Sequence, residues 1–357
     1  MKLSVRIVLA VLCAALIVSM PFFLSSPNLL SEAEMDIQMG GEEDDNSLDF
    51  GRLLFPSAMA EDAEGGHFDS EDIDVDEPTK LSIPESWVLP FDFTVPPEPD
   101  PDHFSENGYE DQSIRVRVET LRLFDSNVNV AYVEIASPSQ LRTAIDNRDH
   151  PVSQIAKANN AVIAMNGDYY RKDSNNKFFE IRMTKALKVG KNLSKSFDTL
   201  VIDKNGDFHV FVLSDGLKDY KEKHMNDISN AFLFGPALVK DGEIVVRENS
   251  KYMYAPNGKD GRSAIGQTGP LSYVMVLVES HSKNSEGVTH AELAQIMYDL
   301  GCIQAYNLDG GNSAELIMQG PSPDVELLHY KGNHEANYRN QSDIVYFATA
   351  VPVEERK

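Results

Sequence analysis

The 357-residue chain is poor in cysteine and in basic residues. Its two cysteines are Cys13, inside an apolar N-terminal stretch, and Cys302, so we expect no disulfide framework. No histidine pair at metal-ligand spacing accompanies the candidate acidic residues described below, which argues against zinc. The 32 lysines and arginines are outnumbered by 56 aspartates and glutamates, and they form no basic cluster. The composition therefore predicts no nucleic-acid partner.

The excess of acid is concentrated in one segment. Between residues 28 and 111 there are 25 acidic residues and only two basic ones, Arg52 and Lys80. High net charge with few apolar side chains cannot bury enough surface to offset the entropy of ordering the chain. We therefore predict a disordered acidic linker over residues 28–112, with SIPESWVLPFDF at 82–93 as an apolar island inside it.

The N-terminal segment IVLAVLCAALIVSMPFFL, residues 7–24, contains no charged side chain. It is longer than the ~7–15-residue apolar core of a signal peptide and approaches the ~20 residues that span a bilayer. Lys2 and Arg6 precede it, and positive charge favours the cytoplasmic side. We expect residues 1–27 to form an uncleaved membrane anchor with the rest of the chain extracytoplasmic. A cleaved signal segment, which would release the protein, is the alternative.

Residues 113–357 have the composition of one globular domain. Asn205-Gly206 and Asp241-Gly242 predict hairpin turns between alternating strands. THAELAQIMYDLG predicts a helix that begins with a capping box at Thr289 and ends at Gly301. SPSQLRTAIDN predicts another helix, with Ser137 as its N-cap. Because helices and hairpins are interleaved, we expect an α/β fold, a mixed β-sheet with flanking helices.

Three predicted strands end or begin in polar residues that folding does not require. AVIAM is followed by Asn166-Gly167-Asp168, Arg262 precedes the small-residue strand SAIG, and AYNL is followed by Asp309-Gly310-Gly311-Asn312-Ser313. A hairpin turn needs only two residues such as Asp-Gly, so the last stretch is longer than a turn requires. Taken singly, each could be a loop or a surface charge. Together they indicate a binding site on loops held by a rigid sheet.

These motifs resemble the phosphodiester glycosidase family in their order and spacing. The matching stretches, between residues 114 and 351, are AMNGDYY, FGPALVKDGEI, GRSAIG, THAELAQIMYDLGCIQAYNLDGGNS and YRNQSDIVYF. The resemblance implies hydrolysis of sugar-1-phosphodiester linkages, and many bacterial members are associated with exopolysaccharide. It implies a pocket built from Asn166, Gly167, Arg262, Asp309, Gly310, Gly311, Ser313, Arg339 and Ser342.

The chain also departs from the family pattern. Asp168 stands where members often carry a second glycine, and Asn312 and Ala314 replace a glycine and a serine. VESH, which ends at His281, stands where members carry VDGR, so one arginine is lost. These departures bear on substrate identity rather than on the fold.

The expected chemistry follows from the substrate. Arg262 and Arg339 would hold the phosphate, because a guanidinium pairs with its oxygens in a bidentate way. The amides of Gly310 and Gly311 would add an anion-binding concavity. Asn312 and Ser313 would hydrogen-bond the substrate.

A carboxylate must then activate water or attack the anomeric carbon. Asp309 is the first candidate, with Asp168 and Glu279 as second carboxylates.

Two alternatives remain open. Asp309 and Asp168 are hard oxygen ligands that would also suit Ca²⁺ or Mg²⁺. The domain could instead be a non-catalytic glycan-binding or exopolysaccharide assembly protein that kept the pocket without the chemistry. The histidines nearest the motifs, His281 and His334, are expected at the surface.

Overall fold

The computed structural model describes residues 80–168, 178–190, 197–246, 258–322 and 326–356. The predicted membrane anchor and the linker up to residue 79 lie outside these residues. Within the described ranges, no helix is both long enough and apolar enough to cross a membrane.

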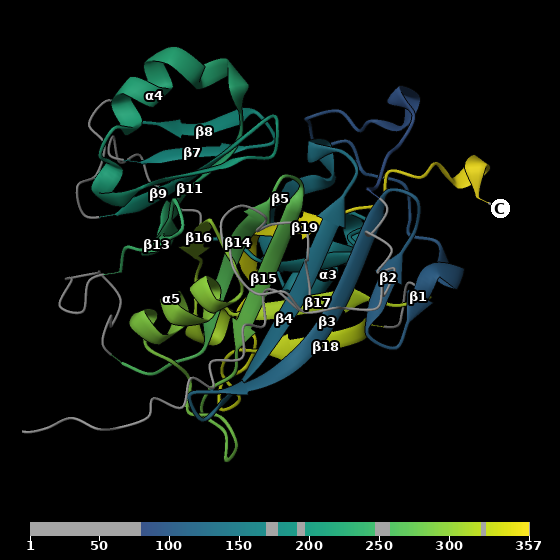
Figure 1. Ribbon diagram of the computed structural model, residues 1–357. Helices are drawn as coiled ribbons and strands as arrows, with labels where there is room; N and C mark the ends of the chain where they lie inside the picture. Colours follow the sequence, from purple (N-terminus) through teal and green to yellow (C-terminus); the bar gives the residue numbers. More distant parts are fainter. Residues whose placement is uncertain (1–79, 169–177, 191–196, 247–257, 323–325, 357) are drawn as a thin grey trace, which may run out of the picture. The chain divides into compact units, whose positions relative to one another are not determined.

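The described strands form three sheets (Figure 1). Sheet A has the order β1 (Phe104–Ser105), β2 (Gly108–Glu110), β3 (Ile114–Leu123), β4 (Ser126–Ile135), β15 (Ser272–Val278), β14 (Arg262–Gly269), β16 (Gln304–Asn307), β12 (Ala237–Lys240) and β13 (Glu243–Ile244). Sheet B has the order β18 (Glu326–Lys331), β17 (Glu315–Gln319), β6 (Ile163–Asn166), β19 (Gln341–Phe347) and β5 (Leu141–His150). Sheet C has the order β10 (Phe208–Phe211), β9 (Asp198–Asp203), β11 (Ile228–Phe234), β7 (Phe179–Arg182) and β8 (Lys185–Val189).

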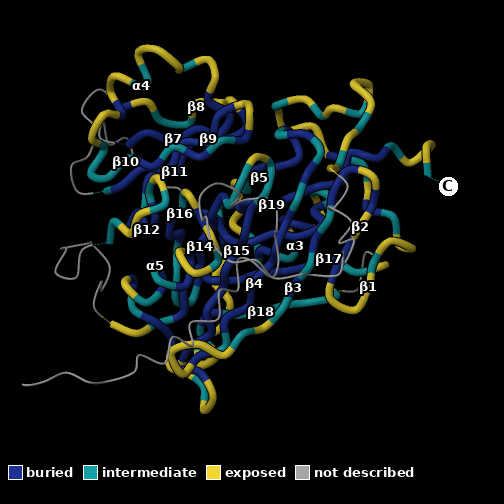
Figure 2. The backbone as a smooth tube through the Cα atoms, in the orientation of Figure 1, coloured by how far each residue is buried: buried dark blue, intermediate teal, exposed yellow. Residues whose placement is uncertain are grey.

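A main core joins the three sheets, and each sheet also packs a helix on its other face. The core combines Val116 and Met275 of sheet A, Met165 and Phe347 of sheet B, and Phe232 of sheet C. Figure 2 shows β11, β15 and β19 largely in the colour of buried residues. The helices are α5 (His290–Asp299) on sheet A, α3 (Val152–Ala158) on sheet B and α4 (Leu217–His224) on sheet C.

The predicted mixed α/β sheet is wrong in its strand directions. Every pair of named strands in the described residues is antiparallel, and helices are few. The predicted hairpins at Asn205-Gly206 and Asp241-Gly242 are confirmed as β9–β10 and β12–β13. The helix at Thr289 is confirmed too, with its capping box to Glu292.

The helix predicted from Ser137 is wrong. Ser137 does begin a capping box with Gln140, but it caps only the 3₁₀ turn Pro138–Gln140. The chain then continues directly into β5, because residues 141–145 pair with β19. Local capping signals were therefore overridden by sheet pairing.

The domain begins earlier than the predicted boundary at residue 113. The carbonyls of Pro90, Asp92 and Thr94 accept hydrogen bonds of 2.7–3.0 Å from the Arg142 guanidinium. β1 and β2 belong to sheet A, and Tyr109 is 1% exposed in the main core. The boundary could not be placed from the acidic composition, because backbone carbonyls, rather than apolar side chains, make many of these contacts.

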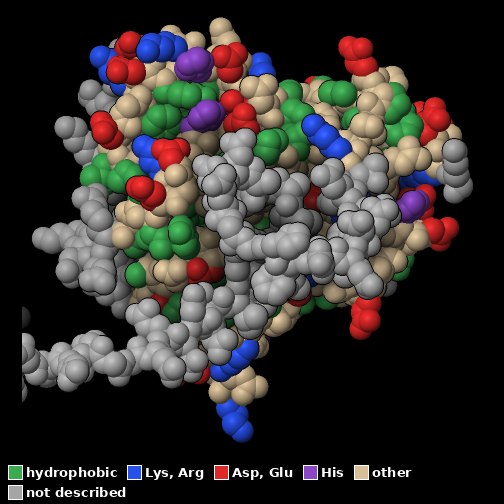
Figure 3. All heavy atoms as spheres, in the orientation of Figure 1, with side chains coloured by type: hydrophobic (Ala, Val, Ile, Leu, Met, Phe, Trp, Pro, Cys, Tyr) green, Lys and Arg blue, Asp and Glu red, His purple; other side chains and the backbone are tan. Residues whose placement is uncertain are grey.

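On the face drawn in Figure 3, acidic and basic side chains are interspersed.

Candidate active site

The three polar strand ends do meet, and Asn166 joins them. This fully buried side chain at the end of β6 donates from Nδ2 to the Asp309 carbonyl at 2.7 Å. Its Oδ1 accepts from Ser263 Oγ at 2.8 Å and from the Glu315 amide at 3.1 Å. Asn166 thus connects β6 with β14 and with both ends of the loop 308–314. Because its amide is engaged within the protein, it positions the loop, whereas the sequence predicted substrate contact.

The loop depends on glycine at two positions. A side chain at Gly167 would overlap the Asp343 carboxylate, and one at Gly310 would approach the Gly261 carbonyl oxygen to 2.7 Å. The Gly311 amide donates to that same carbonyl at 2.8 Å. The Gly310 amide faces the Asp309 carboxylate. The predicted anion cradle of glycine amides is therefore wrong for Gly311, whose N–H is already engaged.

Asp309 is the carboxylate at the centre of the loop. Its side chain is 13% exposed, and Oδ2 has no hydrogen-bond partner among the described residues. Burial raises its pKa to about 6, against the opposing effects of the Ser313 hydroxyl and the Arg339 charge; the Asp343 charge adds to the rise. A carboxylate with this pKa and an unsatisfied oxygen is a typical functional-site group.

Arg339 lies beside Asp309, as predicted. Its Nη1 is 3.8 Å from Asp309 Oδ2 and donates to Ser313 Oγ at 3.1 Å. Half of the arginine side chain is exposed, so the guanidinium remains accessible to an anionic ligand. Ser342 lies on β19, one residue before the buried Asp343.

Arg262 does not complete a two-arginine clamp. Its side chain is buried, with Nε donating to the Val288 carbonyl at 3.0 Å and Nη2 to the Gly258 carbonyl at 2.7 Å. Burial lowers its pKa, partly offset by Asp260. Arg262 ties two backbone segments together, and the phosphate clamp predicted from sequence retains only Arg339.

Asp168 belongs to a buried ionic cluster that sequence reasoning missed. Its Oδ1 is 2.6 Å from Arg182 Nη2, and Oδ2 accepts from the Leu233 amide at 2.8 Å. The same guanidinium contacts Asp343 at 2.8 Å and Glu180 at 3.1 Å. None of these four ionic side chains is more than 4% exposed.

Three carboxylates around one guanidinium leave an excess of negative charge. Burial raises the pKa of Asp168 to about 6 and that of Glu180 well above its usual value. The Arg182 guanidinium also lies over the Phe232 ring, 4.1 Å from its centroid. The Asp343 carboxylate of this cluster packs against Gly167, and the Asp168 carboxylate faces Arg182. The one signal in the sequence was Glu180 and Arg182, two opposite charges two residues apart in the apolar stretch FFEIRM.

Glu279 is also engaged away from Asp309. Its carboxylate accepts from Asn127, Asn129 and His334 at 3.0–3.1 Å. His281 is half exposed and lies 3.3 Å from Asp260. Of the three predicted carboxylates, only Asp309 combines burial, an unpaired oxygen and a neighbouring accessible cation.

A metal site at Asp309 and Asp168 does not fit the geometry, because both oxygens of Asp168 are occupied. Among the described residues, no group of three or more His, Cys, Asp and Glu side chains is arranged to hold a metal ion.

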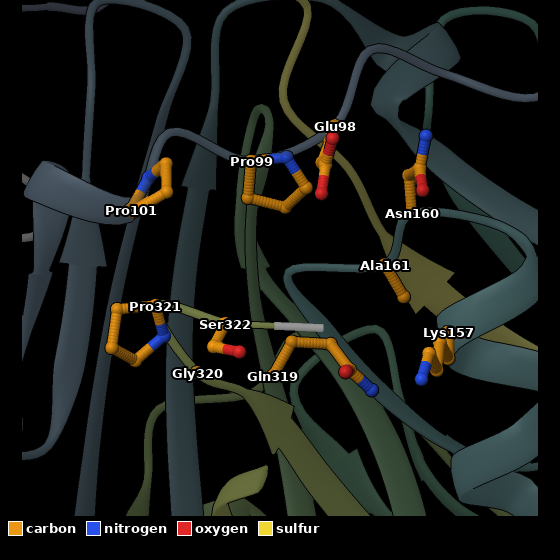
Figure 4. Close-up of a pocket in the computed structure, with 10 residues that line it drawn as sticks. All are labelled: Glu98, Pro99, Pro101, Lys157, Asn160, Ala161, Gln319, Gly320, Pro321 and Ser322. Atoms are coloured by element: carbon orange, nitrogen blue, oxygen red, sulfur yellow. The ribbon is translucent and has the colours of Figure 1, made fainter. Parts of the chain in front are cut away.

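A separate open pocket lies elsewhere, lined by Glu98, Pro99 and Pro101, by Lys157 of α3 and by the end of β17 (Figure 4). None of the predicted site residues lines it.

Comparison with known proteins matches residues 159–348 to the phosphodiester glycosidase family. A curated relative, the SPbeta prophage-derived uncharacterized protein YomE of Bacillus subtilis (strain 168), is 28% identical over 176 residues. That alignment covers 47% of this chain but only 26% of the relative, so the chain spans about a quarter of that protein's length.

Solved structures also match. The zebrafish N-acetylglucosamine-1-phosphodiester alpha-N-acetylglucosaminidase catalytic domain, auto-inhibited by its pro-peptide, is 16% identical, with a TM-score of 0.49. The match covers 66% of this chain and 83% of that one. A hypothetical protein from Synechocystis is 15% identical, with a TM-score of 0.45 and coverage of 67% and 62%.

Proposed function

This chain belongs to the phosphodiester glycosidase family, and we propose that it hydrolyses glycosyl phosphodiesters at the Asp309 site. One observation carries the proposal: the buried Oδ2 of Asp309, which has no hydrogen-bond partner among the described residues, lies 3.8 Å from a half-exposed arginine. The carboxylate suits the anomeric carbon, which gains positive charge as its bond breaks. The arginine suits the phosphate of the same linkage.

In the proposed reaction, the bond between the anomeric carbon and the phosphate oxygen breaks. The phosphate monoester leaves with the bonding electrons. A water oxygen becomes bonded to the anomeric carbon and gives up one proton, to Asp309 or to the departing phosphate. Asp309 acts on that carbon either directly or through the water. Arg339 holds the phosphate. Ser313 Oγ accepts a hydrogen bond from Arg339 and keeps the guanidinium next to the carboxylate. A phosphate monoester is a better leaving group than an alcohol, so no strong general acid is required.

The test uses a panel of α- and β-linked sugar 1-(alkyl phosphate) diesters in ¹⁸O-labelled water. We expect release of free sugar carrying ¹⁸O, and release about 10²–10⁴-fold slower by Asp309→Asn. Label in the phosphate would mean that the phosphorus–oxygen bond is cleaved. Absence of turnover on every diester would reject the hydrolase proposal.

A second candidate is a non-catalytic glycan-binding or exopolysaccharide assembly protein. It is favoured by the loss of two predicted phosphate contacts, since Arg262 and the Gly311 amide bind backbone carbonyls. This candidate predicts calorimetric binding of a glycosyl phosphodiester that is lost in Arg339→Ala, with no turnover by the parent.

We further propose that the protein acts on cell-surface or exported polysaccharide while tethered to the membrane by residues 7–24. The uncharged length of that segment and the preceding Lys2 and Arg6 support this. Externally added protease should remove the domain from intact protoplasts while leaving the N-terminus cell-associated. A mature N-terminus downstream of residue 24 would support the cleaved alternative instead.

A further inference from the structure

His329 lies in β18 between two carboxylates. Its Nε2 is 3.0 Å from Glu315 Oε2, and its Nδ1 is 2.6 Å from Glu326 Oε2. Glu315 is fully buried, and its other oxygen has no partner among the described residues. Burial raises the pKa of Glu315. Burial acts to lower the pKa of His329, but the Glu315 hydrogen bond and the two carboxylate charges outweigh it and raise the pKa. The imidazole is therefore fixed at both nitrogens.

The fixed ring supports Tyr338. The two rings are stacked, with centroids 4.6 Å apart and planes 17° apart. Lys331 Nζ lies 4.6 Å from the Tyr338 centroid and adds a cation–π contact. Tyr338 is 41% exposed, so it gains little from burial, and these contacts account for its placement.

Arg339 is the next residue in the chain. It lies near the end of the loop 332–340, which connects β18 to β19. Two hydrogen bonds hold the beginning of this loop. The Gly332 N–H donates to the Ala314 carbonyl at 2.8 Å, and Asn333 Nδ2 donates to Asn312 Oδ1 at 2.6 Å. The end is held by the stacking of Tyr338 on His329 and by two hydrogen bonds. The Arg339 backbone N–H donates to the Asn312 carbonyl, and the Gln341 side-chain amide donates to the Arg339 carbonyl.

We propose that His329 is a positioning residue for Arg339, acting through the stacked Tyr338. An exposed arginine side chain can adopt many rotamers, so its approach to Asp309 depends on a fixed backbone. The kinetic consequence rests on the proposed hydrolase function. The structural consequence, a loop end held by the ring stack, does not.

His209 provides a matched control in sheet C. It is also partly exposed, lies 3.1 Å from a carboxylate of Asp203, and has its ring centroid 4.9 Å from that of Tyr220. Its substitution removes the same kinds of contact away from Asp309. His329→Gln and His209→Gln are therefore compared in the full chain.

The kinetic arm uses a sugar 1-(alkyl phosphate) that the parent cleaves. Loss of an aromatic stack corresponds to about a fivefold to tenfold rise in KM for His329→Gln, with kcat changed less than about twofold. Tyr338→Ala should reproduce the rise and Tyr338→Phe should not. In an Arg339→Ala background, His329→Gln should add almost nothing, because the group that it positions is gone. An undiminished effect in that background, or a similar effect of His209→Gln, would overturn the proposal.

The structural arm needs no activity. Hydrogen exchange of backbone amides in residues 336–340 should accelerate in His329→Gln and Tyr338→Ala, and remain at the parental rate in Tyr338→Phe and His209→Gln. Unchanged exchange in His329→Gln would refute the positioning role. If the parent cleaves no diester, the hydrolase proposal fails while accelerated exchange still supports the positioning of Arg339.

Discussion

Asp309→Asn should make the protein more stable at neutral pH while it abolishes activity. The Asp309 pKa is raised from 3.8 to about 6. Below pH 3.8 the carboxyl is protonated in both the folded and the unfolded chain, so it has no net effect. As the pH rises toward 6, the unfolded chain ionises first and the folded protein loses stability. Above that pH the penalty stays constant, at about 3 kcal/mol for a shift of this size.

Asparagine keeps the shape and carries no charge, so it should remove this penalty. We expect a gain of about 2–3 kcal/mol in the free energy of unfolding at pH 7.5 and almost no gain at about pH 2.5, well below the unfolded pKa. In urea this corresponds to a midpoint about 1 M higher at pH 7.5. Turnover should fall by about 10²–10⁴-fold, the usual contribution of acid–base groups.

Asp146→Asn is the control of opposite sign. The pKa of Asp146 is lowered: burial acts to raise it, but bonds with His150 and with the Arg148 amide outweigh that effect. Its charge therefore stabilises the fold above its unfolded pKa, and its removal should lower the urea midpoint at pH 7.5. If Asp309→Asn also lowered the midpoint, or raised it equally at both pH values, the assignment of Asp309 as a strained functional carboxylate would be refuted.

Three further outcomes follow from the geometry. Arg182→Met leaves three buried carboxylates without their cation and should cost about 3–5 kcal/mol of stability, measured as a lower urea midpoint. An unchanged midpoint would mean that the ionic cluster does not contribute to stability. Arg339→Ala should raise KM for a diester by about 10–100-fold, the value of a charged hydrogen bond, with little change in melting temperature. A chain beginning at residue 80 should have the same melting temperature as the full chain. One beginning at residue 113 loses Tyr109 and the carbonyl partners of Arg142, so its melting temperature should be lower. Equal melting temperatures would support the predicted boundary at residue 113.

The sequence predicted those features whose signals are local. Thr289 and Glu292 lie three residues apart and form the capping box, and Asn205-Gly206 and Asp241-Gly242 form their turns without distant help. The loop at Asp309 was identified because it exceeds the needs of a turn. Arg339 was predicted as a site residue through the family resemblance, and its guanidinium lies 3.8 Å from Asp309.

The failures involve partners that lie far apart in sequence. Arg182 contacts Asp343, 161 residues away, and no local pattern indicates that a cation in one strand neutralises an acid in another sheet. Arg262 looked like a phosphate ligand because a lone arginine beside a glycine-rich strand end is accessible in most arrangements. Here the carbonyls of Gly258 and Val288 use its donors instead. Residue type and spacing predicted the place of the site, whereas the roles within it depend on which backbone groups reach each side chain.

The charge on Asp309 is costly because of how its neighbours are divided. Ser313, Arg339 and the Gly310 amide stabilise the carboxylate, but Oδ2 has no hydrogen bond among the described residues. Asp343 could be neutralised fully by Arg182, yet it shares that guanidinium with Asp168 and Glu180, so its negative charge still acts on Asp309. One more donor at the loop would remove much of the penalty. The fold instead places side-chain-free glycine at 167, 310 and 311, and the cation beside the carboxylate, Arg339, is half exposed, so that its position depends on its backbone. An arrangement that stabilised Asp309 in the free protein would leave less interaction for a substrate to provide, which is the physical reason that functional carboxylates reduce stability.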